Sequence, residues 1–68
     1  MTVSEAGKGI VKGGYGTYQI GFVNDKGNDD ETEYSAYSLK ELSELFSEFC
    51  RENGFNEDTV TYIRSVNV

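Results

Sequence analysis

Carboxylates are the most abundant side chains in this sequence that could do chemistry, and they gather in two groups. The first is spaced by three, four and four residues: Glu41, Glu44, Glu48 and Glu52. On a helix, at about 100° per residue, these positions share one face. The second group lies in and after a polar segment: Asp29, Asp30, Glu31 and Glu33. Such surfaces attract basic proteins, but glutamate is also a common helix former on exposed faces. Both interpretations of the helical stripe stay open.

The residue types needed for most catalysis are missing. The chain has no histidine, which removes the commonest general base near neutral pH and every Ser–His or Cys–His arrangement. Cys50 is the single cysteine, so neither an internal disulfide nor a zinc site can be built. It falls on the apolar side of the predicted helix, where it is interpreted as a small buried hydrophobe. We therefore predict a protein that is not an enzyme and has no metal or cofactor.

Two loops superficially resemble ligand-binding motifs. Residues 7–16 are rich in glycine but lack the Gly-x-x-x-x-Gly-Lys-Ser/Thr spacing of a phosphate-binding loop. Residues 25–33 are acidic, but Gly27 and Asp29 stand at the third and fifth places and Asp30 at the sixth, which breaks the EF-hand pattern. The glycines are typical of turns, and the acidic segment of a solvated hairpin loop.

The net charge restricts the class of partner. Twelve acidic and six basic residues give a formal charge of −6. This charge argues against direct binding to nucleic acid phosphates and to anionic membranes. It is compatible with a basic protein partner or with solubility alone. No apolar stretch approaches the length of a membrane helix, and residues 1–9 do not resemble a signal peptide, so a cytoplasmic location is expected.

The carboxylates of the first group require a helix, and that helix is the best-defined element. Residues 39–53 carry apolar side chains at three- and four-residue spacing: Leu39, Leu42, Leu45, Phe46, Phe49 and Cys50. Ser38 is the expected N-cap, with Glu41 completing a capping box and Tyr37 facing Leu42 in a hydrophobic staple. Gly54 is the expected left-handed end, after which Phe55 folds back on the helix.

Four segments are predicted to be strands: residues 9–12, 17–24, 32–37 and 59–68. The second shows the clearest alternation, with Tyr18, Ile20 and Phe22 on one face, and it is expected to pair with the third as a hairpin. Residues 1–8 are expected to fray. The predicted fold is a single small α+β domain over residues 1–68, in the order β-β-β-α-β. One amphipathic helix packs on one face of a short, mostly antiparallel sheet.

The last predicted strand raises the possibility of self-association. It is rich in β-branched residues and has no proline, so an exposed edge there would invite pairing with other chains. We predict that it is central in the sheet or paired across a homodimer, with Val60, Tyr62 and Val66 on one face and Ile63 on the other; Val68 is assigned to the first face. A second candidate contact surface is the sheet face that the helix leaves uncovered. It is expected to be partly apolar through the following residues: Val11, Val23, Tyr37 and Ile63.

The sequence thus favours a protein-interaction module that presents the acidic helix face, the acidic loop of residues 25–33, or both, to a basic protein surface. The alternative is a structural domain that dimerises through the last strand or the uncovered sheet face. In size, acidity and α+β make-up the chain is similar to small phage-type inhibitors, including nucleic-acid mimics that block restriction or CRISPR systems. That similarity is one of composition, and it carries no residue roles over.

Overall fold

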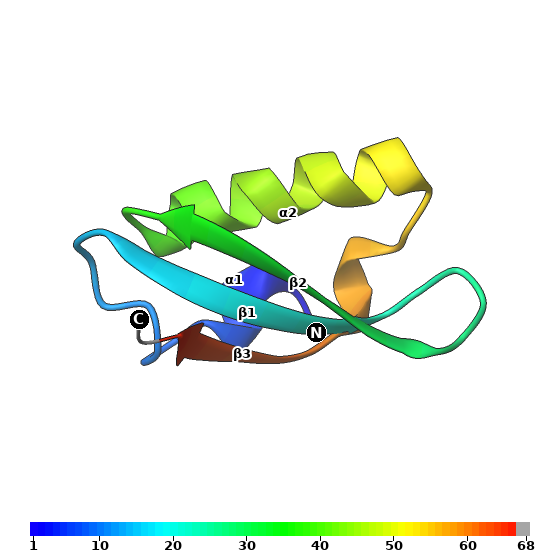
Figure 1. Ribbon diagram of the computed structural model, residues 1–68, viewed down its shortest axis with the longest axis horizontal. Coiled ribbons are helices and arrows are strands. Elements are labelled where there is room, and N and C mark those ends of the chain that lie inside the picture. Colours follow the sequence, from blue (N-terminus) through cyan, green and yellow to red (C-terminus); the bar gives the residue numbers. More distant parts are fainter. Residues whose placement is uncertain (67–68) are drawn as a thin grey trace.

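Three antiparallel strands with two helices on one face make up the computed structural model, which describes residues 1–66 (Figure 1). In chain order the elements are α1 (Val3–Ala6), β1 (Gly16–Val23), β2 (Asp29–Ala36), α2 (Leu39–Asn53), the 3-10 turn η1 (Glu57–Thr59) and β3 (Val60–Val66). The sheet order is β2-β1-β3, with β1 antiparallel to both neighbours. The α+β class with one main helix is confirmed, and the described elements follow the order α-β-β-α-β.

The core lies between this sheet and the helices. The alternating residues Tyr18, Ile20 and Phe22 of β1 are buried, as their period predicts. Phe22 is at the centre of an aromatic cluster, with ring centroids 5.4–5.6 Å from three neighbours: Phe46, Phe49 and Phe55. Large side chains packed this densely are what a 68-residue chain without a disulfide needs, because small domains bury only a modest share of their surface.

Helix α2 has the bounds that its sequence signals predict. The Ser38 side chain accepts a hydrogen bond from the Glu41 amide at 3.1 Å, and Gly54 ends the helix at φ +72°. The Phe55 ring returns to Phe49, as expected. The Glu41 carboxylate reaches one residue farther than in a capping box and accepts from the Tyr37 amide. The staple is wrong, because the Tyr37 ring is exposed and packs on Tyr15 instead of Leu42.

The N-terminal segment differs from the prediction. Residues 2–6 are held by a capping box between Thr2 and Glu5, and Val3 is buried in the core, so residues 1–8 form α1 and its ordered flanks and do not fray. The strand predicted over residues 9–12 is also wrong. The Gly7 carbonyl accepts hydrogen bonds from the amides of Ile10 and Val11, so this segment is a turn. The N-terminal segment therefore contributes helix α1, and not a further strand.

Strand β3 corrects two expectations. It lies at an edge of the sheet, which excludes the central position and leaves pairing across a homodimer as the remaining prediction. An irregularity in its pairing with β1 leaves Thr61 as an extra residue, since Phe22 pairs with Val60 and Gly21 with Tyr62. This bulge breaks the two-residue period, so Val60 and Ile63 both face the core. The expected position of Val68 lies outside the described residues.

The uncovered sheet face is polar, contrary to the expected apolar surface. Ile63 and Val11 belong to or pack against the core, and Tyr37 follows β2, so only Val23 contributes from the expected set. Val66, opposite Thr17, is a second apolar residue on this face, and the others are mainly polar or charged: Thr17, Gln19, Asp29, Glu31, Glu33, Ser35, Tyr62 and Arg64. An apolar docking face is therefore not available on this side of the sheet.

Candidate functional site

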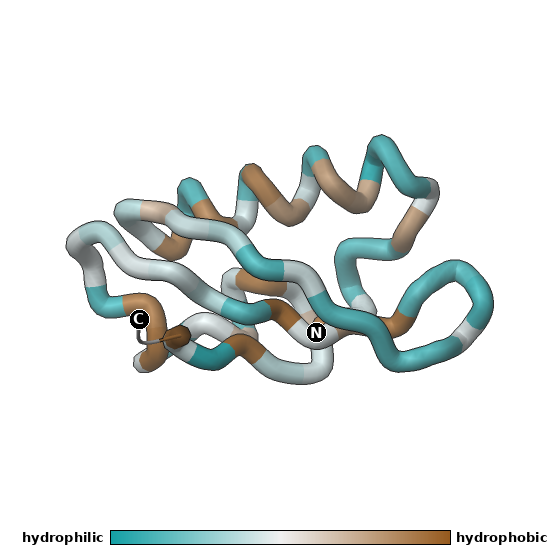
Figure 2. The backbone as a smooth tube through the Cα atoms, viewed as in Figure 1, coloured by the Kyte–Doolittle hydropathy of each residue, from teal (hydrophilic) through white to brown (hydrophobic). Residues whose placement is uncertain are grey.

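The predicted glutamate stripe is present on the surface of α2. All four carboxylates are exposed, while Leu42, Phe46 and Cys50 form the buried line of the helix. In Figure 2 the hydrophilic residues of α2 recur on the turns that point away from the sheet. The Glu41 carboxylate accepts a hydrogen bond from the Tyr37 amide at the start of the helix. The three other stripe residues have no hydrogen-bond or ion-pair partner among residues 1–66: Glu44, Glu48 and Glu52.

Contacts on either side of α2 show how the glutamate stripe is oriented relative to the sheet. The Phe49 ring packs on Tyr34 of β2, with centroids 6.2 Å apart. On the opposite side of the helix, Leu39 lies against Gly7 and Ser47 bonds to Glu57 of η1. At about 100° per residue, the stripe is centred nearly opposite the buried line of α2, so it faces away from the sheet. Glu52 lies nearer the Phe49 flank, and Glu44 lies nearer the Ser47 flank.

The second predicted group is also brought to β2, although not in a loop. Strand β2 begins at Asp29, where Asp29 pairs with Val23 and Asp30 with Phe22. All four carboxylates of the group are exposed. Because side chains alternate along a strand, Asp29, Glu31 and Glu33 project on the open face, and Asp30 on the helix side. We use the name acidic edge for the exposed carboxylates of β2, which lie on both faces of this strand, together with those of the stripe on the outer face of α2.

The negative charge of this surface is hardly neutralised inside the chain. The described residues contain all twelve acidic and all six basic side chains of the sequence. Within residues 1–66, the single ion pair closer than 4.0 Å joins the N-terminal ammonium to Asp58, at 3.9 Å. Asp58 belongs to η1 and not to the acidic edge. The carboxylates of the acidic edge thus keep their charge available to an external cation.

A series of side-chain contacts crosses the open face of the sheet from β3 toward β2. The Tyr62 ring of β3 lies over Gly21, where any Cβ would overlap it, and its hydroxyl donates to the Glu31 carboxylate at 3.0 Å. This hydrogen bond, followed by partial burial, raises the pKa of Tyr62 above its ordinary value. The Arg64 guanidinium lies 5.9 Å from the Tyr62 ring centroid and donates to Gln19. Sequence reasoning missed this arrangement, although a glycine inside a strand is a known signal of close approach.

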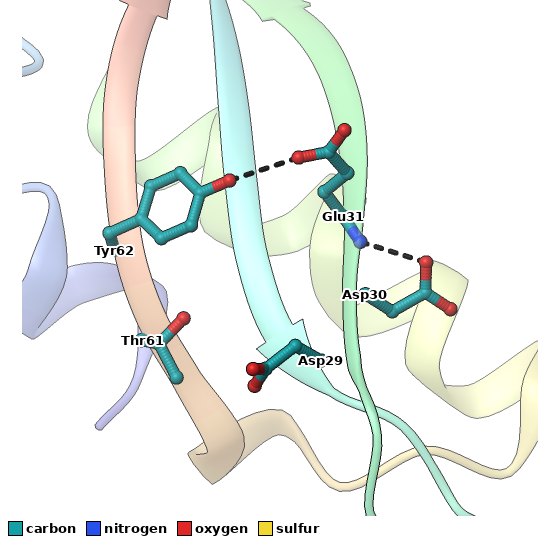
Figure 3. Close-up of a pocket in the computed structure, with 5 residues that line it drawn as sticks. All are labelled: Asp29, Asp30, Glu31, Thr61 and Tyr62. Atoms are coloured by element: carbon teal, nitrogen blue, oxygen red, sulfur yellow. Dashed lines mark hydrogen bonds between the residues drawn. The ribbon is translucent and has the colours of Figure 1, made fainter.

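Glu31 and Tyr62 also line an open hollow of about 550 Å³ at the end of the sheet, together with Asp29, Asp30 and Thr61 (Figure 3). The Asp30 carboxylate accepts from the Glu31 amide at 2.8 Å, and Glu31 is held by Tyr62. No group of three His, Cys, Asp or Glu side chains within residues 1–66 is placed to hold a metal ion. The hollow is better described as an acidic recess that would accept a cationic side chain.

Strand β2 also has a free hydrogen-bonding edge. The Glu31 amide donates to the Asp30 side chain, so it points away from β1. Backbone groups alternate in direction along a strand, which places the amides of Glu33 and Ser35 on the same free side. No other strand of the described chain pairs there. Which amides point outward depends on the register of pairing with β1, so it could not be predicted from the sequence.

Cys50 is buried, as predicted, with 1% of its surface exposed. Burial, with a smaller effect from the Glu57 carboxylate, raises the pKa of its thiol to about 11. A thiol in this state is a poor nucleophile, because the thiolate is the reactive form. Its role in this chain is to fill the core.

Comparison with family models, with curated proteins and with solved structures gave no match. Within the described residues, no helix combines the length and the apolar character needed to cross a membrane. The function therefore has to be argued from the surface of the molecule.

Proposed function

We propose that the chain is a non-enzymatic binding module whose acidic edge docks onto a basic protein surface. The observation that carries this proposal is the set of exposed carboxylates on β2 and on the outer face of α2, which have no basic partner within 4.0 Å among residues 1–66. A design for stability alone would place lysines between the glutamates of α2, since like charges four residues apart destabilise a helix. A complementary basic surface would relieve that repulsion and would be steered toward the site at low salt.

Affinity purification from the source cell tests this proposal when two variants of equal charge are compared. The test variant carries Glu44→Gln and Glu48→Gln on the acidic edge. The control carries Glu57→Gln and Asp58→Asn in η1, which lies on the other side of α2. Both variants lose two negative charges. The proposal predicts a basic partner that the wild type and the control retain and the test variant loses; equal retention by all three would contradict it.

A finer form of the proposal follows from the compositional similarity to phage-type inhibitors. A nucleic-acid-binding protein is one class of basic partner, and a surface with regularly spaced carboxylates can compete for a site that binds phosphates. Glu44, Glu48 and Glu52 are separated by about 6 Å along the helix axis, given a rise of about 1.5 Å per residue. If this form is correct, short duplex DNA added in excess will release the captured partner; a partner that binds DNA and this chain together would contradict it.

Self-association through β3 is a second candidate, and the position of that strand at the sheet edge favours it. The amides of Ile63 and Ser65 point outward there, by the same alternation that fixes the free side of β2. Sedimentation at micromolar protein concentration distinguishes the two functions. A dimer that Ser65→Pro converts to a folded monomer would support this candidate, and a wild-type monomer would exclude it.

A further inference from the structure

We infer that the partner of the acidic edge binds as an extended basic segment that adds a fourth strand to the sheet alongside β2. This inference rests on the proposed function and specifies how the same surface is used. It depends on two properties that occur together at one strand: backbone groups with no partner strand, and carboxylates on both sides of them.

The free edge of β2 is long and regular enough to accept a strand. The strand has eight residues and pairs with β1 without any irregularity, from Gly16 opposite Ala36 to Val23 opposite Asp29. Its outward amides at Glu33 and Ser35 have no acceptor strand among residues 1–66. Strand addition uses such groups for affinity and the alternating side chains for specificity.

The other edge of the sheet is less suitable. Strand β3 contains the bulge at Thr61, and its first residue is already paired, because the Val60 amide donates to the Met1 carbonyl at 2.9 Å and the Val60 carbonyl accepts from the Met1 ammonium. It carries one charged residue, Arg64, which is basic. A basic segment is therefore directed to β2 by both charge and backbone access.

Charge also decides between a basic segment and a second copy of this chain at β2. Two copies of β2 would bring the carboxylates of Glu31 and Glu33 close to those of the partner strand, and like charges across a strand pair are destabilising. An incoming strand with Lys or Arg at alternate positions places those cations beside Glu31 and Glu33 on the open face.

A synthetic decapeptide that alternates lysine with threonine, blocked at both ends, tests the inference by NMR titration of the whole chain. Binding is expected to shift the amides of Glu33 and Ser35 and to slow their exchange with solvent. Ser35→Pro removes one outward amide without removing a bond to β1 or a charge, and it is expected to weaken binding about 3- to 10-fold. Ser35→Ala controls for the hydroxyl that bonds Thr17, and Ser65→Pro places the same substitution on β3. Neither control should alter the affinity.

A second peptide separates backbone pairing from charge. N-methylation of alternate residues keeps every lysine but removes the amide donors along one edge of the peptide, so this peptide should bind at least as weakly as the unmodified one binds to Ser35→Pro. Strand addition is wrong if the methylated peptide binds the wild type with full affinity and the unmodified peptide binds Ser35→Pro with full affinity. If the variant with Glu31→Gln and Glu33→Gln then binds more weakly, the proposed function of the acidic edge is still supported. If the paired glutamine variant also leaves the affinity unchanged, the proposed function of this surface fails as well. Circular dichroism of each variant confirms that the fold is retained.

Discussion

Replacing Glu48 with lysine should stabilise the isolated protein, although it changes no buried contact. Glu48 is exposed in the middle of the stripe and has carboxylates four residues away on both sides, at Glu44 and Glu52. Each like-charge pair of this kind destabilises a helix by about 0.2–0.5 kcal/mol, and an opposite-charge pair stabilises it by a similar amount. The substitution converts two repulsive pairs into two attractive ones, but it also makes the pair with Arg51, three residues farther on, repulsive, so the expected gain is about 0.4–1 kcal/mol. Glu48→Gln removes these interactions without reversing them and should give about half of that gain.

Urea unfolding followed by far-UV circular dichroism measures this gain at low ionic strength. For a domain of this size, 1 kcal/mol also corresponds to a shift of about 4–8 °C in Tm. The difference between wild type and Glu48→Lys should shrink on going from about 0.01 M to about 1 M salt, because the Debye length falls from about 30 Å to about 3 Å. A variant that is no more stable than the wild type at low salt would refute the view that the stripe is electrostatically unfavourable in the free protein.

Three further predictions concern parts of the fold that support the acidic edge. Gly54→Ala should lower the free energy of unfolding by about 1 kcal/mol, because an alanine is strained at φ +72°; urea unfolding that shows no loss would argue against this helix end. Tyr62 should ionise above its ordinary pKa of 10.0, and Glu31→Gln should lower that pKa in an ultraviolet titration. The stabilisation by this hydrogen bond is fully present below pH 10 and is lost as the pH rises through the folded-state pKa of Tyr62. A Tyr62 titration that is unchanged in Glu31→Gln would contradict the contact. Cys50 should react with a thiol reagent only when the chain unfolds, and stoichiometric labelling of the native protein would contradict its burial.

Local signals explain which elements the sequence predicts well. The bounds of α2 follow from a cap at Ser38, an apolar stripe and a glycine at position 54, all of which act within a few residues of the helix itself. The strand around Ile20 follows from a two-residue alternation that the pairing does not disturb. In each case the chain needs no information about distant segments.

The errors come from features that depend on pairing or on very short elements. Helix α1 has four residues, too few to show a period, and its signal was the pair Thr2 and Glu5 at capping-box spacing. The bulge at Thr61 reverses the faces of β3, and a bulge is defined only against the partner strand. The carboxylates of both groups could be identified from the sequence, but the place of Asp29, Asp30, Glu31 and Glu33 on an edge strand could not, because it depends on the order and register of the sheet.

The salt dependence of binding to a basic ligand tests the central claim most directly. The lysine–threonine decapeptide is titrated into the wild type and into the variant carrying Glu44→Gln and Glu48→Gln, at low and at high salt. The acidic edge predicts that affinity falls steeply as salt screens the carboxylates, and that the glutamine variant binds more weakly with a shallower dependence. An affinity that is the same at both salt concentrations, or the same in both proteins, would contradict an acidic edge that recognises basic partners by charge.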